Sequence, residues 1–570
     1  MRIRIVIWGV TAALLFLLIG LLNLEIIHGV RYRELGKKNC LRLVPQPGSR
    51  GRIFDRQAEV IAESALSYDL MVLPQDALQR EKIISSASRI LGISVEELQR
   101  VFKNNYLSAS VPVPLARNIS VKNAIALAEL KGDLPAIIVQ PNPLRHYPHG
   151  KAGAHVLGYV SEIDRWRLTK LKDYGYKTKD IVGFGGVEEK YDYYLRQEEG
   201  GVSFEVDHRG RLIRTLGFKP PVNGKDIRLT LDIRIQKICE ESLRGRRGSV
   251  VMMDPYTGEV LAMASSPGFD PGVFAQKNNA EIARLFKNPN SLMVNRAISS
   301  AYPAGSVFKM VVAAAGLEHK KINANTSFVC SGGMRVGKSE FKCWSTHGEQ
   351  NLLAAITHSC NVFFYKTGLL AGAQAIHDYA LKFGFARMTS FELPYETPGF
   401  VPSPLWRKLN RFKNWYDGDT ANLSIGQGEV LVTPLQVARM TAVLANGGYL
   451  VDPYIVKFID GKDVSRYHER SEKVNLKKNT IEKIREGMRS AVSDPTGTAN
   501  ALSGLGLAIA GKTGTAQAPP GQPHAWFCGF FPYESPRFVI CVLLEHGGPG
   551  HISSVMAKEI IQEMLKQGLI

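Results

Sequence analysis

The chain has 570 residues, 45% of them hydrophobic, and carries a formal net charge of +19. This length exceeds that of one ordinary domain, and this composition excludes a disordered chain. Seven cysteines in so long a chain do not form a disulfide framework. No basic helix, zinc-finger spacing or aromatic RNA-binding signature accompanies the positive charge, so we expect no nucleic-acid partner.

The N-terminal segment predicts a membrane anchor. An uncharged run from Ile5 to Leu22 follows Arg2 and Arg4, and at about 1.5 Å per residue it nearly crosses a bilayer core. No small-x-small cleavage site follows, which favours an uncleaved helix. The two arginines and the free amine favour a cytoplasmic N-terminus, with the rest of the chain outside. Four basic residues beyond the run oppose that orientation: Arg31, Arg33, Lys37 and Lys38.

The region from about residue 44 to residue 222 has no cluster of catalytic residue types. Short β-like runs such as YDLMVLP alternate there with polar helical runs such as REKIISSASRILGISVEELQRVF. Its residues alone indicate a spacer or docking module.

From residue 225 the sequence changes to a pattern of strands and helices. GKDIRLTLDIRIQKICEESL predicts a strand that leads into a helix, and GSVVMMDPYTGEVLAMASSP predicts a β-hairpin. Near the C-terminus, three β runs precede an amphipathic helix, HISSVMAKEIIQEMLKQ. The three runs are LGLAIAGKTGTAQ, HAWFCGFFP and RFVICVLLEHG.

Ser306 and Lys309 are spaced for nucleophilic chemistry. They begin a helix over 307–317 that is apolar nearly all round and should be buried, and the i, i+3 spacing places both side chains on one face. A lysine desolvated in an apolar wall can be neutral enough to take the serine proton. The alternative is a helix-start serine beside a lysine that reaches solvent. SEFK (339–342) has the same spacing but no apolar helix behind it.

Ser359 and Asn361 form the one S-x-N triplet of the sequence, at the start of an aromatic helix, VFFYKTGLL. The hydroxyl could relay a proton to a leaving amine, and the amide offers a donor and an acceptor to a peptide substrate. Lys366 belongs to a K-T-G inside this helix, where a surface lysine is the simpler interpretation.

A second K-T-G, Lys512 to Gly514, ends the β run LGLAIAG. There a strand edge can present backbone N–H groups beside a cation, and Gly514 leaves room for a ligand to approach closely. This triplet is the functional candidate.

The three motifs, in the order S-x-x-K, S-x-N and K-T-G, resemble those of the penicillin-binding proteins, the serine D,D-transpeptidases that cross-link peptidoglycan. GSRGRIFDR, RHYPHGKAGAHVLGYV and GVEEKYDYYL are similar to the entry motif and pedestal of class B members. GDTANLSIGQGEVLVTPLQVA and SCNVFFY are most like penicillin-binding protein 2, the elongation group. One departure is AGS before the nucleophile, where the family commonly has PGS.

The resemblance implies an α+β multidomain fold. Its parts would be a transmembrane anchor (1–27), an elongated α/β pedestal or dimerisation domain (44–222), and a penicillin-binding transpeptidase domain (225–570). The last would hold an antiparallel sheet flanked by helices and an all-helical part.

The resemblance also implies residue roles. Ser306 resembles the acylated nucleophile and Lys309 its base, whereas Ser359 resembles the proton relay and Asn361 the amide clamp. The backbone N–H groups of Ser306 and Thr515 would form the oxyanion hole. Lys512 and Thr513, with Thr515, would hold the terminal carboxylate of a D-Ala-D-Ala stem peptide. The substrate-binding positions are therefore Lys512, Thr513, Gly514 and Thr515.

The implied reaction releases D-alanine and passes the acyl group to a neighbouring stem-peptide amine, with no cofactor in the chemistry. β-Lactams would bind the same site, and a membrane glycan polymerase of the shape, elongation, division and sporulation type would be the partner. Three alternatives stay open: a D,D-carboxypeptidase, a β-lactam-binding sensor, and a structural subunit of a wall-synthesis complex.

Four further residues have the composition of a zinc site: Cys330, Cys343, His347 and Cys360. Their spacing, C-x12-C-x3-H-x12-C, supplies the four ligands of a tetrahedral structural zinc, on a predicted β excursion that folds its ends together. Such a metal would tie this excursion to the loop bearing Ser359. A Cys330 to Cys343 disulfide, in an exported chain, and unlinked buried thiols are the alternatives.

Overall fold

The computed structural model describes residues 1–73, 77–106, 112–206, 212–465 and 471–570. Internal contacts divide the chain into two compact units, each built from several segments. The first comprises Met1–Arg50, Ser64–Leu144 and Arg196–Gly224, and the second comprises Gly51–Glu63, Arg145–Leu195 and Lys225–Ile570. The division into 1–27, 44–222 and 225–570 stays a prediction.

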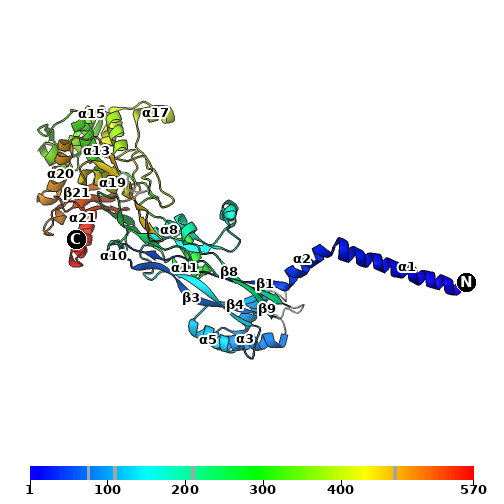
Figure 1. Cartoon of the computed structure of the whole chain (residues 1–570). Helices are drawn as coiled ribbons and strands as arrows, with labels where there is room; N and C mark the ends of the chain where they lie inside the picture. The colour runs from blue at the N-terminus through cyan, green and yellow to red at the C-terminus, as the bar shows by residue number, and fades with distance from the viewer. Residues whose placement is uncertain (74–76, 107–111, 207–211, 466–470) are drawn as a thin grey trace. The chain divides into compact units, whose positions relative to one another are not determined.

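The first unit begins with the apolar helix that the sequence predicts. Helix α1 (Arg2–Leu22) continues into a π-helical turn, Asn23–Ile27, and none of its side chains is buried. Among the described residues, Arg2–Ile27 is the one helix long and apolar enough to cross a bilayer. Helix α2 (Gly29–Cys40) follows it (Figure 1).

The remainder of the first unit combines a three-stranded antiparallel sheet with a small α/β core. The sheet joins β1 (Leu41–Gln46), β8 (Gly200–Val206) and β9 (Leu212–Lys219). The core contains α3 (Ala77–Leu91), α4 (Val95–Asn105), β4 (Val113–Ile119), α5 (Val121–Glu129) and β5 (Ile137–His146), with the part of β3 (Val60–Val72) that belongs to this unit. Apolar side chains of the helices, such as Ile84 and Leu98, pack there against strand residues such as Leu70 and Val113.

The second unit is built on a five-stranded antiparallel sheet, in the order β12–β11–β23–β22–β21. Strands β11 (Gly248–Met253) and β12 (Val260–Ser266) form the predicted hairpin, and β21 (Ala510–Ala516), β22 (His524–Phe531) and β23 (Phe538–Leu544) are the three C-terminal runs. In β23, Cys541 and Leu543 face one core while Ile540 and Val542 face the other, because side chains alternate across a strand. The sheet therefore buries both of its faces.

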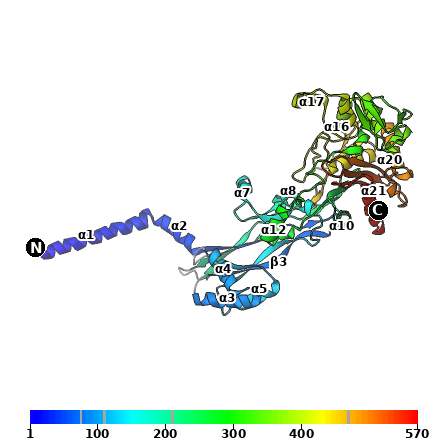
Figure 2. The ribbon, with the colours of Figure 1, turned by 180° about the vertical axis from the view of Figure 1, so that it is seen from behind.

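Helices cover both faces of this sheet, as the fold prediction requires. One face is covered by α10 (Ile233–Ser242) and α21 (His551–Lys566), and the other by α13 (Lys309–Glu318) and α19 (Pro434–Ala445). Figure 1 shows α13 and α21 on opposite sides of the strands. The helical part adds α14 (Leu352–Thr357), α15 (Asn361–Ala371), α16 (Ala373–Lys382), α17 (Pro404–Arg411), α18 (Asp417–Ser424) and α20 (Lys478–Ser493) (Figure 2).

Short elements complete the second unit. Two small antiparallel pairs form the excursion that carries the cysteines: β13 (Phe328–Cys330) with β16 (Gly348–Gln350), and β14 (Gly333–Val336) with β15 (Ser339–Lys342). The pairing of β13 with β16 brings its ends together, which confirms that prediction. The others are β2 (Ile53–Phe54), α6 (Ala154–Leu157), β6 (Tyr159–Glu162), α7 (Arg165–Leu171), β7 (Ile181–Phe184), α8 (Gly186–Lys190), α9 (Asp192–Leu195), β10 (Ile227–Leu229), α11 (Gly272–Ala275), α12 (Asn279–Lys287), β17 (Tyr449–Val451), β18 (Val456–Ile459), β19 (Lys462–Asp463) and β20 (Ser471–Lys473).

Candidate active site

Ser306 lies in a 3-10 turn, Gly305–Phe308, that leads directly into α13. The sequence predicts a helix from residue 307; its α-helical part begins at Lys309 because the first turn is tighter, as is common at helix N-termini. Gly305 has φ +56, and a Cβ at this position would lie 2.7 Å from the carbonyl oxygen of Thr515. Only glycine permits this approach, which sets the half-buried Ser306 next to strand β21.

Lys309 is fully buried one turn after Ser306, as the apolar helix predicts. Its Nζ donates hydrogen bonds to the carbonyl oxygen of Ser359 and to Oδ1 of Asn361, each at 2.7 Å, and lies 3.3 Å from Oγ of Ser359. Burial lowers the pKa of Lys309 to about 8, because desolvation disfavours the charged amine. The structure thus brings the first two motifs into direct contact.

Ser359 occupies a strained position between two helices. Helix α14 ends at Thr357 and α15 begins at Asn361, and Ser359 between them has φ +54, which few residues other than glycine adopt. This left-handed conformation turns the chain so that the Ser359 carbonyl and the Asn361 side chain converge on one amine. Strain of this kind persists where surrounding contacts fix it, and it is common at active sites.

Lys512, Thr513, Gly514 and Thr515 lie inside strand β21, at the edge of the five-stranded sheet. The predicted β run LGLAIAGKTGTAQ is confirmed in its second half, but its start is wrong: the strand begins at Ala510, opposite Phe530 of β22, and continues to Ala516, opposite His524, so the triplet lies within the strand and not at its end. Strand pairing is a tertiary contact that the local sequence does not specify. The edge position is confirmed.

The third motif, on β21, lies next to the turn that bears the first motif. Lys512 is fully buried, its Nζ donates to the carbonyl oxygen of Thr513 at 3.0 Å, and burial together with the charge of Lys309 lowers its pKa well below the usual value. A Cβ on Gly514 would lie 3.3 Å from the backbone nitrogen of Val307. The strand and the turn bearing the serine therefore lie side by side, and the side chain of Thr515 is exposed at the rim.

Neither sequence decoy joins the site. Ser339 and Lys342 are exposed on β15, and only the backbone carbonyl of Lys342 contacts a residue of the three motifs. Lys366 lies on α15 with its Nζ 5.2 Å from the centre of the Phe328 ring. Both placements match the simpler interpretations of these residues.

Several supporting residues were not identified from the sequence. Gln427 Nε2 donates to the carbonyl oxygen of Thr515 at 3.3 Å, and the Gly550 N–H donates to Thr515 Oγ1 at 2.9 Å. Asn361 Nδ2 and the Tyr365 hydroxyl both donate to the carbonyl oxygen of Lys342, at 3.2 and 3.1 Å. These contacts join different segments of the chain, so no local sequence motif predicts them.

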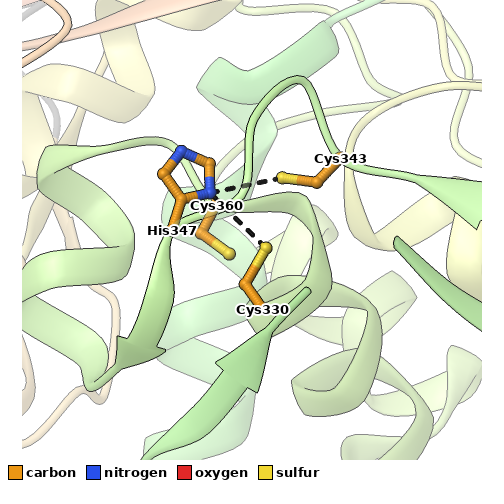
Figure 3. Close-up of side chains that lie close together, drawn as sticks. All are labelled: Cys330, Cys343, His347 and Cys360. Atoms are coloured by element: carbon orange, nitrogen blue, oxygen red, sulfur yellow. Dashed lines mark hydrogen bonds between the residues drawn. The ribbon is translucent and has the colours of Figure 1, made fainter. Parts of the chain in front are cut away.

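The four metal-ligand candidates converge on one point (Figure 3). Their ligand atoms all lie within 4.8 Å of one another, and His347 Nδ1 is 3.5 Å from the sulfurs of both Cys330 and Cys343. Tetrahedral bonds of about 2.3 Å to sulfur and about 2.0 Å to nitrogen would separate these atoms by about 3.5 Å. The residues therefore fit a zinc ion, and all the described cysteines are free thiols in this structure.

The cysteine cluster touches the S-x-N motif directly. Cys360 lies between Ser359 and Asn361 at the start of α15, and the sulfur of Cys343 accepts a hydrogen bond from the Asn361 N–H at 3.2 Å. A hydrogen bond from the Cys360 thiol and nearby backbone N–H groups lower the pKa of Cys343. A thiolate, the form that binds metals, is thus favoured at Cys343.

Comparisons with known proteins show the family of the chain. Residues 248–566 match the family profile of the penicillin binding protein transpeptidase domain, and residues 45–229 match that of the penicillin-binding protein dimerisation domain. The peptidoglycan D,D-transpeptidase MrdA of Acinetobacter baumannii is 32% identical over 567 residues, covering 95% of this chain and 84% of that protein.

Solved structures show the same similarity. Penicillin-binding protein 2 in complex with MreC from Helicobacter pylori aligns with a TM-score of 0.81 at 27% identity, over 93% of this chain and 99% of that chain. A chain from a structure on the coordination of polymerization and crosslinking by a peptidoglycan synthase complex aligns with a TM-score of 0.74 at 29% identity, over 98% of this chain and 97% of that chain.

Proposed function

The chain belongs to the class B penicillin-binding proteins, and we propose that Ser306 is the nucleophile with which it cross-links peptidoglycan. It is a peptidoglycan D,D-transpeptidase of cell elongation. The observation that carries the residue assignment is the buried amine of Lys309, one turn from Ser306 and hydrogen-bonded to both functional residues of the S-x-N motif. A serine becomes an effective nucleophile only with such a base beside it.

In the acylation step, the Ser306 hydroxyl gives its proton to neutral Lys309 and its oxygen attacks the carbonyl carbon of the penultimate D-alanine. The two oxygens that lie 2.7 Å from the amine accept its two N–H groups, which leaves the lone pair for the serine proton. An ester bond forms, and the amide bond to the terminal D-alanine breaks. Ser359 Oγ, 3.3 Å from the amine, passes the proton to the leaving nitrogen.

Strand β21 holds the substrate during this step. Lys512 and Thr513, with Thr515, bind the terminal carboxylate, and the backbone N–H groups of Ser306 and Thr515 stabilise the oxyanion. Gly514 allows the strand to lie against the turn that bears Ser306, since a Cβ there would press on Val307. In the second step an amine of a neighbouring stem peptide attacks the ester and restores the serine; water in its place would give a D,D-carboxypeptidase.

We also propose that Cys330, Cys343, His347 and Cys360 hold a structural zinc ion. The ion would supply a rigid cross-link and no chemistry, because the four protein ligands fill a tetrahedral shell. Two of the ligands flank Asn361 in space: Cys360 precedes it, and Cys343 accepts its N–H. The cluster thereby holds the amide that contacts Lys309.

For location, we propose that α1 anchors the chain in the cytoplasmic membrane with the catalytic unit outside. Arg2 and Arg4 at the N-terminus support this orientation. For partners, we propose a membrane glycan polymerase of the shape and elongation type. The similar chain from a peptidoglycan synthase complex that coordinates polymerization and crosslinking supports that proposal.

Peptide mapping of the acyl-enzyme tests the nucleophile. Trypsin separates the two S-x-x-K serines, because Ser306 falls in the peptide Ala297–Lys309 and Ser339 falls in Ser339–Lys342. A labelled penicillin should add its mass to the first peptide. Label on the second peptide, or on neither, would refute the assignment.

A further inference from the structure

Helix α17, in the helical part of the second unit, presents an apolar face to solvent. Leu405 and Leu409 are 63% and 62% exposed, and Phe412, directly after the helix, is 89% exposed. Leu405 and Leu409 lie on one side of the helix because they are four residues apart, and Phe412 follows at the left-handed residue that ends it. Trp406 anchors the other side, with its ring 4.5 Å from that of Phe400. Exposed apolar side chains that gather in this way mark an interaction site.

The same segment is strongly basic. Residues 404–416 contain four positive side chains and no acidic one: Arg407, Lys408, Arg411 and Lys413. Arg407 pairs with Asp419 at 2.7 Å and Arg411 with Glu429 at 3.6 Å. Within the described part of the chain, Lys408 and Lys413 have no ion-pair partner and both are exposed. Two cations are thus available to an anionic ligand.

Contacts connect α18, the helix that follows α17, to the S-x-N motif. Helix α17 leads into α18, where a Cβ on Gly418 would lie 3.3 Å from the Phe341 ring. The Phe341 ring contacts that of Tyr365, with centroids 5.6 Å apart. The Tyr365 hydroxyl shares the Lys342 carbonyl with the amide of Asn361. Helix α17 therefore adjoins α18 through the Arg407–Asp419 ion pair, and α18 packs against α15, the helix that begins at the S-x-N motif. Figures 1 and 2 both show α17 at the outer edge of the second unit.

We propose that the α17 surface, formed by Leu405, Lys408, Leu409, Phe412 and Lys413, binds the peptidoglycan strand outside the catalytic cleft. The inference rests on the proposed function, which makes a long glycopeptide polymer the substrate. Stem peptides end in carboxylates, which complement Lys408 and Lys413, and the faces of N-acetylated sugars pack on exposed aromatic and aliphatic side chains. The surface would hold the polymer while one stem peptide reaches Ser306.

A matched pair of double variants tests this surface. Phe412 and Lys413 form an exposed Phe-Lys pair at the end of α17, and Phe286 and Lys287 form an exposed Phe-Lys pair at the end of α12. We would compare Phe412→Ser/Lys413→Glu with Phe286→Ser/Lys287→Glu in the full chain. The probe is uncross-linked, pentapeptide-bearing peptidoglycan strands, with binding measured on Ser306→Ala backgrounds so that no acyl-enzyme forms.

The α17 variant should bind the strands about five-fold or more weakly, whereas the α12 variant should bind like its parent. With Ser306 restored, both variants should react with a fluorescent penicillin at the parental rate, because a small ligand does not reach the α17 surface. Equal strand affinity in the two variants would overturn the proposal. Failure of the proposed function is distinguishable, because the chain with Ser306 would then neither acylate nor release D-alanine, whatever its strand affinity.

Other occupants of the surface are separate outcomes. Binding to vesicles of anionic phospholipid, or concentration-dependent self-association, could depend on Phe412 and Lys413 while strand binding does not. Either result would overturn the proposal in favour of a membrane or a second copy of this chain.

Discussion

The amine of Lys309 and the amide oxygen of Asn361 are 52 residues apart in sequence and 2.7 Å apart in space. This hydrogen bond joins the buried helix α13 to the start of α15 and fixes the base relative to the S-x-N motif. Because Asn361 also donates to Cys343 and to the Lys342 carbonyl, the cysteine excursion supports the same contact. Several outcomes depend on it.

Replacing Ser306 should abolish acylation, whereas replacing Ser339 should not. Ser306→Ala removes the attacking oxygen, while Ser339 is exposed on β15 without a buried lysine behind it. Fluorescent penicillin labelling, with folding verified by circular dichroism, measures both variants. Equal loss of labelling in the two would show that the wrong site had been chosen.

Replacing the two K-T-G lysines should likewise have different effects on acylation. Lys512→Ala removes a buried amine from β21 that would bind the substrate carboxylate, and it should lower the acylation rate constant about a hundredfold, as the loss of one electrostatic contact in an active site does. Lys366→Ala changes a residue beside Phe328 on α15 and should have little effect. The reverse order of the two effects would refute the role of the edge strand.

Acylation should accelerate as pH rises toward the pKa of Lys309. Burial lowers this pKa from 10.5 to about 8, and only the neutral amine accepts the serine proton. Below pH 8 the neutral fraction, and with it the rate, should rise about tenfold per pH unit before it levels off. Rates at saturating penicillin isolate this step from carboxylate binding by Lys512. A rate that stays flat or falls over this range would contradict a lysine base.

Removing one metal ligand should lower both the zinc content of the protein and its acylation rate. Cys360→Ser leaves Ser306 and Lys309 unchanged but breaks a ligand set that should hold about one equivalent of zinc. Cys239→Ser, at a buried cysteine in the opposite core, is the control and should keep the metal. Elemental analysis gives the readout. Wild-type protein with under about a tenth of an equivalent, prepared without chelators, would exclude the zinc proposal.

The residues of the three motifs could be identified from the sequence because each motif is a short run of neighbouring residues. Ser306 and Lys309 share one helical turn, and the apolar residues after them already indicate burial. Strand β21 shows the limit: the apolar residues of LGLAI suggest that the strand starts there, yet the pairing with β22 begins only at Ala510, opposite Phe530, and runs through the triplet to Ala516, opposite His524. Register with a distant strand is absent from the local pattern.

The supporting contacts of the site could not be predicted from such local patterns. The left-handed backbone of Ser359 has no local signal, because serine rarely adopts it. The bond from Asn361 to Cys343 depends on the β13–β16 pairing that folds the excursion back. Sequence spacing predicted the four zinc-ligand candidates, and the structure brings their ligand atoms together.

The measurement that tests the central claim most directly follows both products of the reaction. Full-length protein is incubated with uncross-linked, pentapeptide-bearing peptidoglycan, and released D-alanine is counted against newly formed stem-peptide amide bonds by mass spectrometry. The account predicts one new amide bond for each D-alanine released by the wild type, and neither product from Ser306→Ala. Release of D-alanine without new amide bonds would identify a carboxypeptidase, and turnover that survives Ser306→Ala would contradict the nucleophile proposed for this chain.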